Sequence, residues 1–293
     1  MPLPNPLRQQ VESALGHEIT RSVPASGGCI NNGARLDTAA AGSFFLKWNA
    51  SAPPEMFDAE ADGLEALRAA CTLRIPRPLA RGGGDHGPSW LLLEYVGPGA
   101  PAPDYWQRLG ASLAELHGAP ADSGFGWRRA NWIGSLTQAN DEKASWAAFW
   151  RDLRIVPQLE LARSNGFMRD DILDRLVEVI PDALRGVGDG GLLHGDLWSG
   201  NAYATAEGAP IVIDPAVYRG DGEVDLAMTE LFGGFGSRFY DAYDASRAIS
   251  QEYEPFKRDL YQLYYLLVHV NLFGASYERG SLAAATRVVD VLH

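Results

Sequence analysis

The chain is 293 residues long, and with 46% hydrophobic and 21% charged residues it has the composition of an ordinary globular protein rather than a disordered one. At roughly 100–200 residues per domain, the length allows one large domain or two lobes. Lys and Arg number 25 against 37 Asp and Glu. This net charge of −12 argues against nucleic acid or an anionic membrane as a partner, because both favour a basic surface.

The first hundred residues read as strands with one helix. A Gly-rich turn at residues 26–33 (SGGCINNG) precedes an apolar strand at residues 43–48 (SFFLKW), and a helix follows at about residues 54–71. After a second Gly-rich turn at residues 82–87 comes a strongly apolar strand at residues 90–96 (WLLLEYV). This order predicts a small lobe built from strands and a helix.

The Pro- and Gly-rich stretch at residues 98–103 marks the best candidate boundary in the chain. Beyond it, apolar periodicity predicts a C-terminal helix and further helices at residues 105–117, 145–164, 170–185, 223–232 and 254–273. Two short strands are expected at residues 192–194 and 211–213. The sequence therefore predicts an α+β fold with a small lobe at residues 1–97, a linker at 98–103 and a larger, mainly helical lobe at 104–293.

The cysteine content and the apolar runs indicate the cellular compartment. Only Cys29 and Cys71 occur, which excludes a disulfide framework and a zinc cluster. The first residues lack the basic and apolar regions of a signal peptide. The longest apolar run, residues 260–273, is too short and too polar to span a bilayer. We therefore expect a cytoplasmic protein.

The most informative segment is HGDLWSGN at residues 194–201, which is followed by IVIDP with Asp214. Phosphoryl transfer from MgATP needs an acid that orients the acceptor hydroxyl and oxygen ligands for the metal. Asp196 and Asn201 have the five-residue offset of the protein-kinase catalytic loop. Asp and Asn are also common turn residues, but this set between two predicted strands favours a kinase site.

A kinase site also needs a lysine for the phosphates and an acid that holds this lysine. Lys47 is the only cation of its strand, and one face of the next helix carries Met56, Glu60, Leu64, Leu67 and Cys71. A carboxylate among apolar side chains is costly unless it is paired. Taken separately, Lys47 could equally well be an exposed strand lysine, and Glu60 could equally well be an acid at the rim of the apolar face. Their order before the catalytic segment favours a Lys47–Glu60 pair.

Two further segments would complete a nucleotide site. The turn that contains Gly27 and Gly28 would cover the phosphates, although it lacks the G-x-G-x-x-G pattern and is a weak signal alone. The second apolar strand would provide a hinge whose backbone pairs with adenine, and its nucleotide-binding residues would be Leu93, Glu94, Tyr95 and Val96. The alternative for this strand is simple burial.

The remaining histidines and aromatic residues are interpreted as structural. We expect His194 to pack the catalytic segment, and His117 and His269 to be core or boundary histidines. A cluster in the helix at residues 254–273 is expected to pack rather than to bind a ligand: Tyr261, Tyr264, Tyr265 and Phe273.

These segments resemble the fructosamine kinase (ketosamine-3-kinase) family. The resemblance rests on HGDLWSGN, IDPAVYRGDGEVDLAMTELFGGF and LYQLYYLLVHVNLFG, together with GGCIN, FFLKWN, MFDAEADGLEAL, LLLEYV, LGASLAELH and NWIGSLTQAN in the same order. It covers about residues 27–274. The Trp in HGDLWSGN and the DPA after the second strand separate the chain from aminoglycoside and choline kinases, which share the general plan.

The resemblance implies a two-lobed, protein-kinase-like fold with an antiparallel sheet in the small lobe. It also implies ATP-dependent phosphorylation of the sugar 3-hydroxyl of a ketoamine, which is either a small molecule or a glycated lysine. The 3-phosphate product decomposes and frees the amine, so the family acts in deglycation. The alternatives are a related small-molecule kinase of the same fold and an inactive nucleotide-binding scaffold.

Carried over residue by residue, the resemblance implies that Asp196 accepts the proton and that Asn201 and Asp214 hold Mg²⁺. Lys47 with Glu60 would hold the ATP phosphates, and Asp225 would fix the backbone of the catalytic segment. Gly195 stands where protein kinases have an arginine that reads a phosphorylated activation loop. We therefore expect a constitutively competent enzyme.

Two residues near the site carry open hypotheses. Trp198 either stacks on the sugar or amine arm of the substrate, where cation–π attraction contributes roughly 0.5–2 kcal/mol, or packs its loop onto the lobe. Cys29 lies in the Gly-rich turn, whose backbone N–H groups favour a thiolate. Oxidation would cap it or link it to a second chain and slow turnover. The alternative for Cys29 is a half-buried residue without a role.

Overall fold

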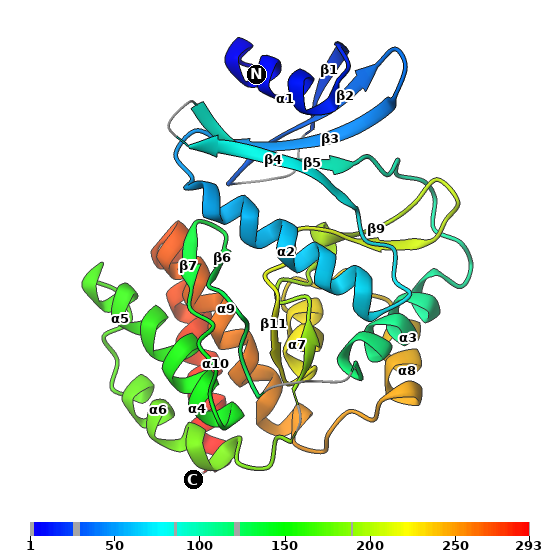
Figure 1. The fold of residues 1–293 in the computed structure, drawn as a ribbon. Coiled ribbons are helices and arrows are strands. Elements are labelled where there is room, and N and C mark those ends of the chain that lie inside the picture. The colour runs from blue at the N-terminus through cyan, green and yellow to red at the C-terminus, as the bar shows by residue number, and fades with distance from the viewer. Residues whose placement is uncertain (1–2, 26–29, 85–86, 120–123, 189, 293) are drawn as a thin grey trace.

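The computed structural model describes residues 3–25, 30–84, 87–119, 124–188 and 190–292, and it forms two lobes, one above the other in Figure 1. The upper lobe holds a five-stranded antiparallel sheet with strand order β1-β2-β3-β5-β4. Its elements are α1 (Asn5–Leu15), β1 (Ile19–Ala25), β2 (Asn32–Thr38), β3 (Gly42–Asn49), α2 (Pro54–Ala70), β4 (Pro78–Gly84) and β5 (Gly87–Glu94). The sequence predicted one helix here, and this was wrong: α1 buries only Leu7 and Val11, a stripe too narrow to be recognised.

The sheet packs against a helix on each face because the side chains of β5 alternate. Trp90 and Leu92 cluster with the buried residues of α1. Leu91 and Leu93 instead belong to the main core, which also contains the buried side chains of α2. Since both of its faces are covered, β5 has the continuous apolar sequence that marked it as a strand. The same arrangement places α2 between the sheet and the lower lobe (Figure 1).

The lower lobe is mainly helical, and α9 runs through its core with nine buried residues. Its helices are α3 (Tyr105–His117), α4 (Trp146–Trp150), α5 (Val156–Ser164), α6 (Ile172–Ala183), α7 (Glu223–Leu231), α8 (Ser237–Ser246), α9 (Arg258–Phe273) and α10 (Glu278–Leu292). The helix predicted at residues 145–164 consists of α4 and α5 joined by one π-helical turn. The sequence did not predict α8.

Short two-stranded sheets position the catalytic segment in the lower lobe. These are the pairs β6 (Asn131–Ile133) with β7 (Leu136–Gln138), β8 (Gly191–Leu193) with β11 (Tyr218–Gly220), and β9 (Ala202–Ala204) with β10 (Pro210–Val212). The two predicted strands are present, within one residue, as β8 and β10. HGDLWSGN begins immediately after β8, and Asp214 lies two residues after β10. The unpredicted β6–β7 hairpin lies beside α2.

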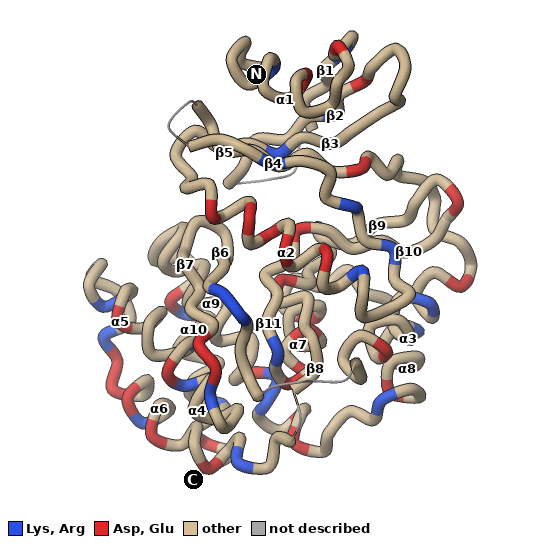
Figure 2. Tube along the Cα trace, in the orientation of Figure 1, with Lys and Arg blue, Asp and Glu red and all other residues tan. Residues whose placement is uncertain are grey.

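Acidic and basic residues are interspersed over both lobes, and several acidic positions follow one another along α2 (Figure 2). Among the described residues, no helix combines the length and apolarity that a membrane span requires.

Candidate active site

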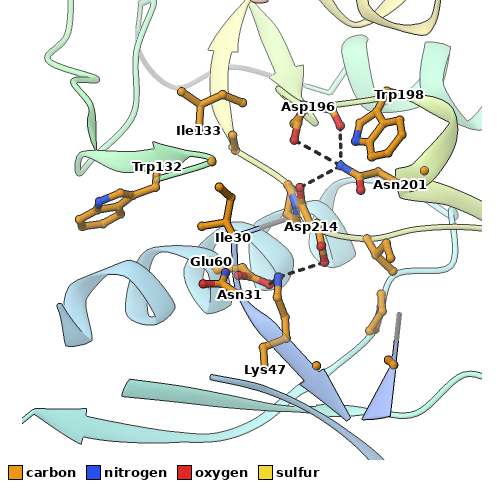
Figure 3. Close-up of a pocket in the computed structure, with 18 of the residues that line it drawn as sticks. Ile30, Asn31, Lys47, Glu60, Trp132, Ile133, Asp196, Trp198, Asn201 and Asp214 are labelled. Carbon is orange, nitrogen blue, oxygen red and sulfur yellow. Dashed lines mark hydrogen bonds and ion pairs between the residues drawn. The ribbon is translucent and has the colours of Figure 1, made fainter. Parts of the chain in front are cut away.

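A cavity of about 870 Å³ lies between the two lobes and is lined by both. Strand β3 and helix α2 contribute Lys47 and Glu60 to its lining, and the segments after β8 and β10 contribute Asp196, Asn201 and Asp214. Figure 3 shows these side chains directed toward one another around Asp214. Residues separated by up to 167 positions in the sequence thus meet at one place.

The Lys47–Glu60 pair predicted from the sequence is present. Lys47 Nζ donates to Glu60 Oε1 at 2.7 Å, and it lies 3.0 Å from Asp214 Oδ1. Lys47 is 7% exposed, so burial works against its charge, but the carboxylates of Asp214 and Glu60 raise the pKa of Lys47 above its usual value. The ammonium therefore remains charged at neutral pH and links the two lobes.

The catalytic segment holds its polar side chains in a compact group. Asn201 Nδ2 donates to the Asp196 carbonyl at 2.8 Å and to Asp196 Oδ2 at 3.3 Å. Asp214 has a φ of 57°, a left-handed backbone conformation that is rare outside glycine and that clusters at functional sites. With the Asn201 amide nitrogen engaged, its amide oxygen and the carboxylate of Asp214 are the oxygens that could hold a metal ion.

Asp196 has a strongly perturbed pKa. Burial, together with the negative charges of Asp214 and Asp225, raises the pKa of Asp196 to about 7. The hydrogen bond from Asn201 lowers this pKa but does not offset the rise. A carboxyl group poised near neutral pH can accept a proton from a hydroxyl group and release it again.

Asp225 fixes the backbone before Asp196, as the resemblance implied. Its carboxylate accepts the N–H groups of His194 at 2.7 Å and of Gly195 at 2.8 Å. Gly195 has a φ of 81°, and a Cβ at this position would lie 2.1 Å from the carbonyl oxygen of Ala216. The position where protein kinases have arginine therefore admits no side chain. His194 is 1% exposed and contacts the Ile213 carbonyl through Nε2 at 2.9 Å, which confirms its structural interpretation.

The segment at the end of β5 lines the cavity as well, with Leu93, Glu94, Tyr95 and Val96. Part of its backbone is engaged within the protein. The Glu94 N–H donates to the Arg77 carbonyl at 2.9 Å, and the Val96 carbonyl accepts the Tyr203 hydroxyl at 2.9 Å. No acceptor for the Val96 N–H is found among the described residues.

One wall of the cavity is aromatic, and most of this wall was not predicted from the sequence. The wall is formed by Trp198, Phe232, His269, Phe273 and Tyr277. His269 was expected in the core or at its boundary, and Phe273 was expected to pack. His269 is a boundary residue, as expected: it is half-buried, its Nδ1 contacts the Tyr265 carbonyl at 2.7 Å, and its ring lies 5.0 Å from that of Phe232 in the cavity wall. Phe273, by contrast, is 50% exposed. Three of these residues follow Tyr265 at spacings of four, a pattern that could have revealed a common face.

The other structural interpretations are confirmed for the described residues. Tyr261 and Tyr264 are buried, and His117 is 2% exposed between Tyr243 and Asp225. Trp198 is partly buried; its ring covers Gly200 and also lines the cavity. Gly27, Gly28 and Cys29 lie outside the described residues, whereas Ile30 and Asn31, which follow them, line the cavity.

Comparison with known proteins places this site in context. The model of the fructosamine kinase family matches residues 5–290. The chain is 42% identical to a probable ketoamine kinase of Synechocystis sp., over 93% of this chain and 92% of that protein. It is 37% identical to the chloroplastic protein-ribulosamine 3-kinase of Arabidopsis thaliana, over 95% of this chain and 86% of that protein.

A solved structure assigned as a fructosamine-3-kinase, from Thermobifida fusca, has a TM-score of 0.86 and 30% identity, and the match covers 98% of this chain and 100% of that one. The predicted two-lobed, kinase-like α+β fold is thereby confirmed.

Proposed function

Because the chain belongs to the fructosamine kinase family, we propose that it transfers the γ-phosphoryl group of ATP to the sugar 3-hydroxyl of fructosamine or ribulosamine adducts. Membership makes it an ATP-dependent phosphotransferase that acts on a hydroxyl group of ketoamines in deglycation. One observation carries the assignment of residues. The Lys47–Glu60 pair of the upper lobe meets Asp214 of the lower lobe at 3.0 Å, beside Asp196.

We assign nucleotide binding to the upper side of the cavity, within a lobe of residues 1–97 that a linker at 98–103 joins to the lobe of residues 104–293. Lys47, held by Glu60, would bind the phosphates, and the turn containing Gly27 and Gly28 would cover them. At the end of β5 the Val96 N–H is the candidate donor to adenine. Phosphoryl transfer depends mainly on positioning and electrostatic stabilisation, which such a rigid lysine provides.

Asn201 and Asp214 would hold Mg²⁺. Two protein ligands fit this ion, since Mg²⁺ usually keeps several waters and binds through one or two side chains plus substrate phosphates. When bound, it would neutralise the charge that develops on the transferred phosphoryl group. Asp196 would orient the sugar hydroxyl and accept its proton, and its pKa of about 7 suits this exchange.

The aromatic wall would bind the ketoamine. The amine of a ketoamine is cationic, and aromatic faces attract a cation. Such a contact removes water from only one ion, whereas a buried ion pair removes it from two. Trp198 lies closest in sequence to Asp196, and we propose that it stacks on the sugar or the amine arm. Trp198→Ala, compared with the wild type at equal distance below each unfolding temperature, should raise the KM for ketoamine far more than that for ATP. Equal effects on both would favour a packing role.

The function is tested by measuring ADP formation with fructosyl and ribulosyl adducts of one amine, with the free amine and with an aminoglycoside. Turnover that requires the ketoamine, together with a sugar 3-phosphate product identified by NMR, would support the proposal. Turnover with the aminoglycoside alone would indicate a different small-molecule kinase and contradict the proposal. ATP binding without any turnover would indicate an inactive scaffold. A panel of free and protein-bound adducts then separates the two substrate classes. The cytoplasm remains our proposed location.

A further inference from the structure

Helix α2 is attached to the lower lobe by an aspartate that the phosphoryl-transfer chemistry does not use. Asp62 lies two residues after Glu60, so the two side chains leave the helix in different directions. Asp62 Oδ2 accepts Trp127 Nε1 and Arg128 Nε, each at 3.0 Å, and the terminal nitrogen of Arg128 contacts Oδ1. Only 17% of the Asp62 side chain is exposed. One carboxylate thus receives three donors from the other lobe.

The donors are themselves fixed to the catalytic side of the lower lobe. The backbone N–H of Trp127 donates to the Asn140 carbonyl at 2.8 Å. The neighbouring Gly126 exchanges two backbone hydrogen bonds with Arg219, at 3.1 and 2.8 Å. Arg219 lies in β11, and β11 pairs with β8, the strand that leads directly into His194 and Asp196. A continuous set of hydrogen bonds therefore joins α2 to the catalytic segment.

Close packing reinforces this connection next to Asp62. Gly63 lies against Val217, and a Cβ on Gly63 would come within 2.9 Å of Val217 Cγ2. Val217 follows Asp214 by three residues. The helix that carries Glu60 consequently rests on the chain that carries Asp214, with no room for a side chain between them.

In protein kinases the position of the corresponding helix decides whether the lysine–glutamate pair forms, and activation-loop phosphorylation controls that position. Here Gly195 excludes the arginine through which such control acts. We propose that Asp62, Trp127 and Arg128 form a permanent clamp that replaces control by phosphorylation. The clamp holds α2 so that Glu60 keeps Lys47 aligned for the phosphates. Asp62 is thus a positioning residue for nucleotide binding, and this inference rests on the nucleotide role proposed for Lys47.

The same helix offers a matched control one turn earlier. Asp58 pairs with Arg81 of β4, which belongs to the same lobe as α2. Its side chain is 39% exposed. Asp58→Ala removes an aspartate–arginine contact from α2 without loosening the connection between the lobes. It should leave nucleotide affinity unchanged.

The experiment measures MgATP affinity by calorimetry, without ketoamine, for the wild type, Asp58→Ala, Asp62→Ala and Trp127→Phe. Trp127→Phe keeps an aromatic side chain but removes the Nε1 donor together with part of the indole, and it remains informative if Asp62→Ala fails to fold. We expect Asp62→Ala to weaken MgATP binding about tenfold and Trp127→Phe about threefold, as losses of hydrogen bonds to a charged group. In a Glu60→Gln background, Asp62→Ala should add less than a twofold further loss, because the clamp acts through Glu60.

Unchanged MgATP affinity in both clamp variants would overturn the inference. A tenfold loss that persists in the Glu60→Gln background would also overturn it, because a purely structural contact acts independently of Glu60. A wild type that binds MgATP but phosphorylates no ketoamine would refute the proposed function and leave the clamp standing. A wild type that binds no MgATP would refute both.

Discussion

Asp196 lies within the catalytic segment and Asp225 holds the backbone of that segment, and the pKa values of these two carboxylates shift in opposite directions. Burial and two neighbouring negative charges raise the pKa of Asp196 to about 7. Burial acts on Asp225 too, but hydrogen bonds from His117 and from the backbone outweigh it and hold the pKa of Asp225 below its usual value. Asp225 is fully buried, whereas Asp196 is partly exposed at the cavity.

The two sites differ most in the hydrogen-bond donors that face each carboxylate. Asp225 is completely buried and receives two backbone N–H groups and a histidine ring, which together replace the water it has lost. Asp196 receives one weak side-chain bond, from Asn201 at 3.3 Å. A fully satisfied carboxylate serves as a structural anchor, whereas an undersatisfied one at a cavity retains its affinity for a proton.

The largest contrast should come from the same isosteric substitution at both positions. Asp196→Asn should lower turnover by about 10²-fold or more, because the acceptor for the hydroxyl proton is lost. MgATP affinity should stay within about twofold, because an asparagine has the same side-chain volume and keeps an oxygen that accepts the hydrogen bond from Asn201 Nδ2. Steady-state kinetics and calorimetry measure the two quantities. Near-normal turnover would remove Asp196 from its role.

Asp225→Asn should instead act on stability. Replacing the carboxylate by an amide weakens three charge-assisted hydrogen bonds and directs N–H groups toward N–H groups, which we expect to lower the free energy of unfolding by about 2–3 kcal/mol. Chemical denaturation at pH 7 measures this change. A loss below 0.5 kcal/mol, the range of an ordinary surface substitution, would contradict the anchoring role.

The parts of this site that sequence could predict are those set by short-range spacing. The Lys47–Glu60 pair followed from helical period, from the cost of an unpaired carboxylate and from the order of the two residues before the catalytic segment. The Asp196, Asn201 and Asp214 set followed from fixed offsets around two short strands. Both depend on local geometry, which the chain dictates within one or two elements.

Features that depend on distant partners were not predictable in this way. Asp62 reads as one more acid on a polar helix face, because its donor Trp127 is 65 residues further along the chain. Phe273 has the same spacing as the core aromatics of α9, and only the position of the upper lobe makes its side of the helix a cavity wall. Periodicity identifies a face but does not say whether that face meets core or ligand.

Asp214→Asn should affect nucleotide binding where Asp196→Asn does not. Loss of a charged metal ligand should weaken MgATP binding about tenfold, while ATP binding without Mg²⁺ should change little. Calorimetric titrations of both variants with MgATP, and with ATP in EDTA, test this division of roles. Equal MgATP affinities for the two variants would contradict it.

The smallest expected effect concerns stability without metal. The Asp196 carboxyl has a pKa of 3.8 when unperturbed and of about 7 in the folded protein. The folded protein therefore binds more protons than the unfolded chain between these values, and stability falls as the pH rises from about 4 to 7. Asp196→Asn removes this loss. Relative to the wild type, its free energy of unfolding should therefore be higher by about 1 kcal/mol at pH 8 and unchanged at pH 4, a gain that solvent screening at the cavity keeps small.

For Asp225 the sign is reversed. Its lowered pKa contributes stability at neutral pH that is lost on acidification, so the loss of stability caused by Asp225→Asn should become smaller toward pH 3. Thermal unfolding in EDTA at pH 3, 4, 6 and 8 measures all three proteins. If the wild type and Asp196→Asn differ by the same amount at pH 4 and pH 8, Asp196 ionises as an ordinary carboxylate and the contrast with Asp225 does not hold.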